Sequence, residues 1–327
     1  MNRTAIEWTD FSARPIKYRD ADGRAAWGCI KASAGCQNCY AEAISRRYRG
    51  PGAGFTAKRM EGLTPYVDKA ELKAMLSPRR LPAGSKVFVG DMTDIFGPWV
   101  PFDMLDRLFA VFALRPDVVF QVLTKRPERM REYLTQRDTV GAIAITIREV
   151  APDGGLAAMQ AMGTHVMRDV VQRRWPLPNV WLGTSVEDQA AADRRIPELL
   201  ACPAAVRFVS AEPLLGPVDL TTIRHGNDND LPVLGTQWGP DWVIVGGESG
   251  PGARPCDIGW IRSIVEQCKA AGVACFVKQL GSSPYFPADC DCEGEHGNHR
   301  TAGRLKDRKG GDMSEWAEDL RVREMPR

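Results

Sequence analysis

The sequence predicts an α/β protein built on a full or partial parallel β/α barrel. Three observations support this fold class: short apolar, β-branched runs recur from residue 86 onward, helical segments separate them, and polar residues end each run. Strands that are apolar on both faces are typical of parallel sheets, which helices cover on both sides. The carboxyl ends of such strands meet on one face of a barrel, where active sites form.

Six runs fit this description of a buried strand. They are KVFVGDMTD (86–94), VVFQVLTKRPE (118–128), NVWLGTSVED (179–188), VRFVSAEPLL (206–215), WVIVGGESG (242–250) and ACFVKQLG (274–281). A seventh strand is expected to lead into a cysteine loop near residue 29. Helical periodicity connects the runs, as in Pro101 to Leu114, Gln189 to Leu200 and Ile258 to Ala271. The alternative is an open doubly wound sheet, but that fold uses its strand ends mainly at one switch point. Polar residues at six successive ends favour the barrel.

The remaining segments define the domain organisation. Residues 1–281 are expected to form the barrel with its N-terminal cysteine loop, and residues 282–327 a C-terminal extension or lid. An insertion near 135–178 interrupts the repeat. Within it, Ala142 to Thr146 reads as a short strand or part of the insertion, and Leu156 to Arg173 as a helix. Residues 222–238 read as a polar loop.

Composition places the chain among cytoplasmic proteins. The 327 residues are 44% hydrophobic with a net charge of +2, so charge alone does not indicate a nucleic-acid binder. The N-terminus lacks a signal-peptide core and no apolar run approaches the length of a membrane span. Nine cysteines, an odd number, argue against a secreted disulfide framework.

Three of the nine cysteines are grouped in WGCIKASAGCQNCYAE (27–42). Cys29, Cys36 and Cys39 have the spacing C-x6-C-x2-C, and a helical run follows directly. Thiolates suit iron–sulfur clusters or zinc. A structural zinc site uses four protein ligands, whereas three thiolates leave one iron of a cluster open. A zinc site completed by a distant His or Cys, and simple buried thiols, are the alternatives. Cys290 and Cys292 with nearby histidines match no standard zinc spacing and are expected in an acidic loop.

Polar residues at the strand ends are the candidate binding residues. They are Gly90, Asp91, Lys125, Ser185, Glu212, Gly246, Gly247, Glu248 and Lys278. The Gly-Gly-Glu end could cradle a carboxylate or phosphate, with Glu248 on an ammonium or ribose hydroxyl, or it could be a tight turn that needs positive φ. Lys125 and Lys278 could hold an anion or balance the carboxylates. A basic loop follows the cysteines, with Arg46, Arg47, Arg49, Lys58 and Arg59, and is either a solvated surface or a phosphate-contacting rim.

Nine motifs in order resemble a phage- and prophage-associated family with a three-cysteine motif, described as radical-SAM-like. They are IEWTD, GCIKASAGCQNCYAE, VFVGDMTDIF, LTKRPERM, NVWLGTSVED, RFVSAEPLLGPV, WVIVGGESGPGARP, VKQLG and LRVREMP. The resemblance covers Ile6 to Pro326. The first cysteine gap differs from the C-x3-C-x2-C of mainstream radical-SAM enzymes, and their Gly-Gly-Glu-like motif lies on an early strand.

The resemblance implies a TIM-type barrel with a [4Fe–4S] cluster on Cys29, Cys36 and Cys39 and S-adenosylmethionine on the open iron. Tyr40 would be the aromatic residue beside the cluster. Residues 90–92 and 246–248 would hold the methionine or ribose part. An external donor of the flavodoxin or ferredoxin type would supply the electron that cleaves adenosylmethionine. The phage association and the basic loop favour a nucleic acid or nucleotide substrate, in base modification or as a repair lyase.

Two functions from other classes compete with this one. The first is a nucleic-acid-binding protein whose cluster is structural or a redox sensor. The second is a zinc-dependent hydrolase with Glu248 or Glu212 as its base. The sequence identifies no catalytic residue, substrate, redox partner or oligomeric state.

Overall fold

The computed structural model describes residues 1–150, 164–225, 229–286 and 305–326. The chain divides into two compact units. The first contains Met1–Lys31, Ala41–Gly183 and Ala201–Val206, and the second contains Ala32–Tyr40, Thr184–Leu200 and Arg207–Arg327. The division therefore passes through the cysteine motif and through strand β8 (Val180–Ser185).

The first unit contains a mostly parallel sheet. Its strand order is β1 (Asn2–Arg3), β2 (Phe11–Ala13), β6 (Lys86–Val89), β7 (Val119–Thr124) and β8. Strands β2, β6 and β7 are parallel, and only the short β1 runs antiparallel to β2. The apolar runs at 86–89 and 119–124 thus form buried parallel strands, as predicted.

A small antiparallel sheet and three helices carry the chain from β2 to β6. The sheet has the order β4 (Ala25–Ala26), β3 (Ile16–Arg19) and β5 (Thr64–Val67). The helices are α1 (Tyr40–Arg49), α2 (Ala57–Glu61) and α3 (Lys69–Leu76), with 3-10 turns η1 (Ala34–Cys36) and η2 (Pro51–Ala53) around α1. The helix predicted after the cysteines is therefore α1. Asp68 caps α3 by accepting hydrogen bonds from the backbone amides of Ala70 and Glu71.

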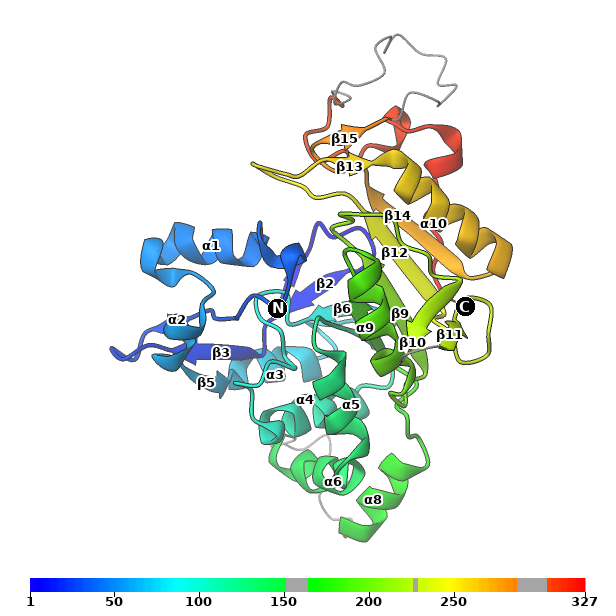
Figure 1. Ribbon diagram of the computed structural model, residues 1–327. Helices are drawn as coiled ribbons and strands as arrows, with labels where there is room; N and C mark the ends of the chain where they lie inside the picture. Colours follow the sequence, from blue (N-terminus) through cyan, green and yellow to red (C-terminus); the bar gives the residue numbers. More distant parts are fainter. Residues whose placement is uncertain (151–163, 226–228, 287–304, 327) are drawn as a thin grey trace. The chain divides into compact units, whose positions relative to one another are not determined.

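Four further helices belong to the first unit: α4 (Phe102–Leu114), α5 (Pro127–Thr135), α6 (Thr139–Val150) and α8 (Thr164–Gln172). Helix α6 contacts both α4 and α8 (Figure 1). The possible strand at Ala142 to Thr146 is wrong, because these residues lie inside α6. In α6, the helical spacing of the apolar residues outweighs the preference of its β-branched residues for strands. The buried positions repeat at helical spacing: Val140, Ile143, Ala144 and Ile147. Of the helix expected over 156–173, residues 156–163 lie outside the described residues.

The second unit continues the parallel pattern after β8. Strands β9 (Val206–Ala211), β12 (Trp242–Gly246) and β14 (Ala274–Gln279) are parallel, in the order β8-β9-β12-β14. Helix α9 (Gln189–Leu200) follows β8, and α10 (Ile258–Ala271) connects β12 to β14 and packs against both, as Figure 1 shows. The three helices predicted from periodicity are thus α4, α9 and α10.

One segment of the second unit differs from the expected polar loop, and two further short strands and the C-terminal tail complete the unit. Within 222–238, β10 (Thr222–His225) pairs antiparallel with β11 (Asn229–Pro232), so the loop prediction is wrong there. Strand β13 (Cys256–Asp257) pairs with β15 (Pro284–Tyr285). The tail has two 3-10 turns, η3 (Met313–Glu315) and η4 (Glu318–Leu320), and then lies against β14, where the Val277 amide donates to the Val322 carbonyl at 2.8 Å.

The predicted parallel α/β class is confirmed, since all six apolar runs form strands and parallel pairing predominates. In neither unit do the strands over the described ranges close into a ring. No helix in the described part of the chain has the length and apolar character needed to span a bilayer.

Candidate metal centre

The cysteine motif starts in the first unit and ends in the second. Cys29 belongs to the first unit, whereas Cys36 and Cys39 belong to the second. Cys36 ends the 3-10 turn η1, and Cys39 directly precedes α1. All three side chains are partly exposed. The Cys36 Sγ accepts a hydrogen bond from the Ala32 amide at 3.5 Å, the kind of contact that stabilises a thiolate.

In the first unit, hydrogen bonds hold the carbonyls on both sides of Cys29. The Thr93 hydroxyl donates to the Gly28 carbonyl at 2.7 Å, and Arg126 Nη2 donates to the Ile30 carbonyl at 2.7 Å. Thr93 follows β6 and Arg126 follows β7, so the carboxyl ends of two parallel strands fix the backbone of Cys29. The Tyr18 hydroxyl bonds Thr93 Oγ1 at 2.9 Å, and burial raises the pKa of Tyr18 well above its usual value.

Arg126 is itself held in place from two sides. Its Nη1 donates to Asp94 Oδ2 at 3.0 Å, and its guanidinium lies over the Trp99 ring at 4.7 Å. Asp94 also accepts from the Thr124 hydroxyl at 2.7 Å and from the Lys125 amide at 3.1 Å. Asp94 therefore joins the ends of β6 and β7, and the guanidinium reaches from this junction to the cysteine loop.

The predicted residues Gly90 and Asp91 lie at the end of β6. Gly90 has φ +89°, and a Cβ there would lie 2.6 Å from Ile95 Cγ2, so glycine is required. Arg14 holds Asp91 through three contacts, Nε to Oδ1 at 2.8 Å, Nε to Oδ2 at 3.0 Å and Nη2 to Oδ2 at 2.7 Å. Asp91 is buried and engaged by a bidentate guanidinium within its own unit.

In the second unit, Glu248 is the residue that fastens the cysteine loop. Its side chain is only 6% exposed and follows the glycines at the end of β12. Asn38 Nδ2, between Cys36 and Cys39, donates to Glu248 Oε2 at 2.8 Å and to the Gly252 carbonyl at 2.9 Å. The loop between the two cysteines is thus bonded to the β12 end.

Arg254 completes this attachment. Its Nε and backbone amide each donate to Glu248 Oε2 at 2.9 Å, and its Nη2 donates to Oε1 at 2.5 Å. Its Nη1 donates to the Ala34 carbonyl, in η1, at 2.9 Å. Burial raises the pKa of Glu248, but the hydrogen bonds from Arg254 and Asn38 outweigh it, so the pKa lies below its usual value. Three of these four donor contacts end on Oε2 and one ends on Oε1, so both carboxylate oxygens are engaged within the unit.

The glycines before Glu248 serve a close approach of two strands. The Gly247 amide donates to the Gln279 carbonyl at 3.1 Å, and a Cβ on Gly247 would lie 2.3 Å from the Leu280 carbonyl oxygen. Positive φ occurs only later, at Gly250, with φ +102°. Gly247 is therefore needed because the end of β14 lies directly against it.

The other predicted residues of this unit form ion pairs at neighbouring strand ends. Lys278 on β14 donates to Glu212 Oε1, after β9, at 2.6 Å. Arg195 Nη1 donates to the Ser185 carbonyl at 2.8 Å and to Glu187 Oε2 at 2.9 Å, and both charged side chains are almost fully buried. Of the two roles that the sequence left open for Lys278, anion binding and charge balance, the ion pair with Glu212 corresponds to charge balance. Tyr40 is the first residue of α1 and is 51% exposed.

Sequence reasoning missed the residues that do the fastening: Asn38, Thr93, Asp94, Arg126 and Arg254. All five lie inside motifs that the sequence singled out. These residues could have been found because they are polar and lie in the same motifs as the expected ligands. Polar residues in such positions commonly hold the ligands of a metal centre by hydrogen bonds without binding the metal themselves.

Four further cysteines of the described residues lie outside the motif. Cys202, Cys256, Cys268 and Cys275 are buried, and burial raises the pKa of the Cys256 thiol to about 12. The segment with Cys290, Cys292 and the two histidines lies outside the described residues.

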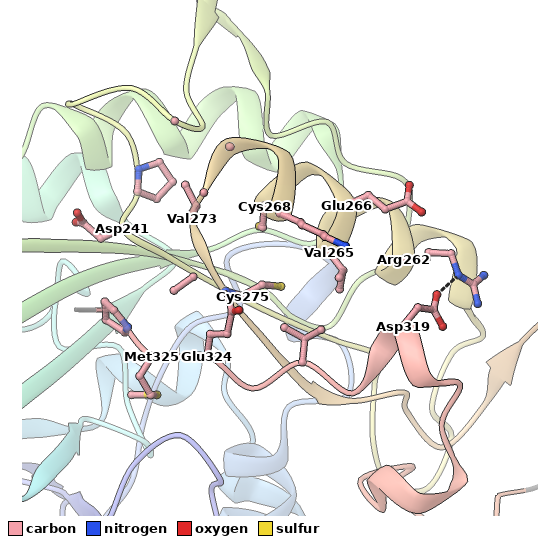
Figure 2. Close-up of a pocket in the computed structure, with 18 of the residues that line it drawn as sticks. Asp241, Arg262, Val265, Glu266, Cys268, Val273, Cys275, Asp319, Glu324 and Met325 are labelled. Atoms are coloured by element: carbon pink, nitrogen blue, oxygen red, sulfur yellow. Dashed lines mark hydrogen bonds and ion pairs between the residues drawn. The ribbon is translucent and has the colours of Figure 1, made fainter.

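A hollow of about 1240 Å³ lies elsewhere in the second unit, between α10 and the tail at the amino end of β14 (Figure 2). It contains none of the predicted binding residues.

The three motif cysteines are a soft-donor set suited to an iron–sulfur cluster. Among the described residues, no three His, Cys, Asp or Glu side chains are gathered into a ready metal site. What the structure does contain is the surrounding hydrogen-bond shell, built separately in each unit. The residues present therefore fit a thiolate-bound cluster in donor type and in support of the ligand loop.

Comparisons with known proteins yield one match. A family model described as "Protein of unknown function (DUF5131)" matches residues 3–313. Neither the curated proteins nor the solved structures contain a match to the chain.

Proposed function

We propose that this chain, which belongs to the DUF5131 family, is an iron–sulfur enzyme of the radical-SAM-like type. The observation that carries the proposal is that both parts of the cysteine motif are fastened to carboxyl ends of parallel strands. Thr93 and Arg126 hold the Cys29 segment, and Glu248, through Asn38 and Arg254, holds the segment with the other two cysteines. Loops that carry ligands need such support.

Cys29, Cys36 and Cys39 would hold a [4Fe–4S] cluster, and the fourth iron would take S-adenosylmethionine. Such a cluster, when bound, supplies one electron to its ligand. The chain's own residues orient the thiolates: Arg126 and Arg254 each place a guanidinium on a carbonyl of the cysteine loop. Each guanidinium is also paired with a carboxylate, Asp94 or Glu248, so it orients the loop without adding net positive charge.

The substrate and the finer fold are part of the same proposal. We expect a nucleic acid or nucleotide as substrate, a partial β/α barrel as the enclosing fold, and an external electron donor of the flavodoxin or ferredoxin type. The support for the barrel is that predicted binding residues recur at the ends of β6, β7, β8, β9, β12 and β14.

Anaerobic reconstitution with iron and sulfide tests the metal. The wild-type protein should turn brown and bind about four irons, as a [4Fe–4S] cluster requires. Cys29→Ala, Cys36→Ala and Cys39→Ala should each lose the colour and most of the iron. Cys202→Ala is the matched control, since this buried thiol lies outside the motif and its loss should leave the iron content unchanged. Retained iron in all three motif variants would overturn the assignment.

One observation favours a second candidate, a nucleic-acid-binding protein with a structural or redox-sensing cluster. Glu212 and Glu248, the carboxylates expected to contact a ligand, are both engaged by cations of the chain. A ribose hydroxyl would have to displace one of these contacts. Calorimetric titration of the reconstituted protein with adenosylmethionine distinguishes the candidates: binding supports the enzyme, and its absence with an intact cluster supports the second candidate.

A further inference from the structure

Helix α1 presents an exposed surface of aromatic rings and cations that the cluster does not use. We define the α1 surface as Trp27, Arg47, Tyr48 and Lys58. Tyr48 is 69% exposed, and its ring makes an edge contact with Trp27 at a centroid distance of 6.4 Å. The buried side of α1 is different in character, since it consists of Ala41, Glu42 and Ser45.

Hydrogen bonds hold the segments around this surface to α1. Arg49 at the end of α1 donates to the Ala25 carbonyl in β4, which holds the segment just before Trp27 to α1. The Ser45 hydroxyl donates to the Ala53 carbonyl at 2.9 Å and Glu42 accepts from the Phe55 amide at 3.2 Å. These two bonds hold residues 53–55, which lead into α2 and Lys58, to α1.

The surface has an excess of positive charge. Residues 40–61 contain five cations and two carboxylates, and one of these carboxylates, Glu42, is buried and paired with Lys31 and Arg46. Among the described residues, neither Arg47 nor Lys58 has an ion-pair partner. Exposed rings beside unneutralised cations are the combination that binds single strands, because bases stack on the rings and phosphates meet the cations.

We infer that the α1 surface binds single-stranded nucleic acid. Tyr48 and Trp27 would stack with an unpaired base, and Arg47 and Lys58 would contact the backbone. A duplex keeps its bases stacked on one another and cannot use the rings in this way. Trp27 is two residues before Cys29, so the bound strand would lie next to the cysteine segment of the first unit. The inference rests on the proposed function for its choice of a nucleic acid over other polyanions.

Fluorescence anisotropy with a short labelled oligothymidylate tests the surface. Tyr48→Ala should weaken binding roughly five-fold or more, as expected for one lost stacked base, and Tyr48→Phe should stay within about two-fold because its ring still stacks. Trp238→Ala is the matched aromatic control, since Trp238 is 66% exposed in the second unit. Its affinity should equal that of the wild type.

The salt dependence tests the cations separately. Arg47→Ala should reduce the slope of log K against log salt by about 0.7, the value for one lost phosphate contact on a single strand. Arg79→Ala removes an exposed cation in the turn that follows α3; it is the control and should leave the slope unchanged. Equal binding of single strand and duplex, or an unaffected Tyr48→Ala, would overturn the inference. Competition by polyglutamate as strong as by oligothymidylate would also overturn it and indicate an acidic protein partner.

Cys29→Ala protein, titrated in parallel, separates this inference from the proposed function. Strand binding by this iron-free variant, with the Tyr48 effect intact, supports a surface that acts independently of the cluster. Wild-type protein that binds the strand with the same Tyr48 effect but takes up no iron would overturn the cluster and leave the surface standing. Wild-type protein that holds its iron but binds no strand overturns the surface alone.

Discussion

At the scale of single residues, Glu248 holds the segment of the cysteine loop that belongs to the second unit. The sequence predicts this carboxylate as a contact for an ammonium group or a ribose hydroxyl. In the structure, its carboxylate receives donors from Asn38 and from three positions of Arg254. Any role in ligand binding would therefore be shared with the support of the cysteine loop. The two roles predict different pH behaviour.

Glu248→Gln should destabilise the protein by about 1.5–3 kcal/mol at pH 7, the range for a hydrogen bond to a charged group. The folded pKa of Glu248 lies below its usual value of 4.5, because Arg254 and Asn38 outweigh burial. Its stabilisation is therefore complete above pH 4.5 and is lost as the pH falls through the folded pKa. Urea unfolding between pH 7 and pH 3 should show the two proteins converging at the acid end.

Glu266→Gln, an exposed carboxylate on α10, serves as the control for this comparison. A wild-type and Glu248→Gln difference that stays constant down to pH 3 would contradict the assigned role. Adenosylmethionine affinity of the folded variant, measured beside the unfolding curves, shows whether ligand binding depends on Glu248 as well.

At the scale of elements, the ends of parallel strands position the cysteine loop by hydrogen bonds to its backbone. Arg126 follows β7 and bonds the Ile30 carbonyl and Asp94 with two different nitrogens. Arg126→Lys should speed the loss of iron to a chelator by roughly 10-fold or more, because an ammonium cannot reproduce the planar two-sided contact. Time-resolved bleaching of the reconstituted protein measures this rate.

The control for Arg126 is Arg129, three residues later in the first turn of α5. Arg129 donates to the Val100 carbonyl at 2.7 Å and its guanidinium lies over the Phe102 ring at 4.4 Å, but it does not contact the cysteine loop. Arg129→Lys should release iron at the wild-type rate. If both variants bleach equally fast, Arg126 acts through general stability and not through the loop.

The contact between β12 and β14 supports a second prediction at this scale. Gly247→Ala should cost about 1–3 kcal/mol, because the added Cβ meets the backbone oxygen of Leu280 at 2.3 Å and the strand ends must separate. Gly216→Ala is the control, since its Cβ would meet only Asp188 Cβ at an ordinary 3.7 Å. Urea midpoints of the two variants provide the test, and equal midpoints would show that the strand ends are not tightly packed.

At the scale of the whole molecule, the three motif cysteines belong to both compact units, since the chain passes from the first unit to the second between Lys31 and Ala32 and returns after Tyr40. Cluster binding to the native state alone should stabilise the fold by mass action. The reconstituted wild type should therefore melt at a higher temperature than the metal-free protein, and Cys29→Ala should show no increase on the same treatment. Anaerobic differential scanning calorimetry measures this. An increase that persists in Cys29→Ala would indicate metal bound elsewhere.

The sequence by itself determined the parallel α/β class, six strands and three connecting helices. These features depend on local apolar periodicity and on the polar residues that end each run, as in Ile258–Ala271. It also located the cysteine motif and the helix after it. Where two local signals conflicted, as in Ala142 to Thr146, the packing of α6 decided for the helix.

Only the tertiary structure decided which partners the charged residues have. Asn38 and Glu248 are 210 positions apart, and Arg126 and Ile30 are 96 apart. Such pairs depend on which strand ends become neighbours, and no local pattern records that. The same reason explains why the two roles predicted for Gly247, an anion cradle and a tight turn, do not include strand packing. The strand that crowds Gly247, β14, comes about thirty residues later in the chain, where the Gln279 carbonyl accepts a hydrogen bond from the Gly247 amide.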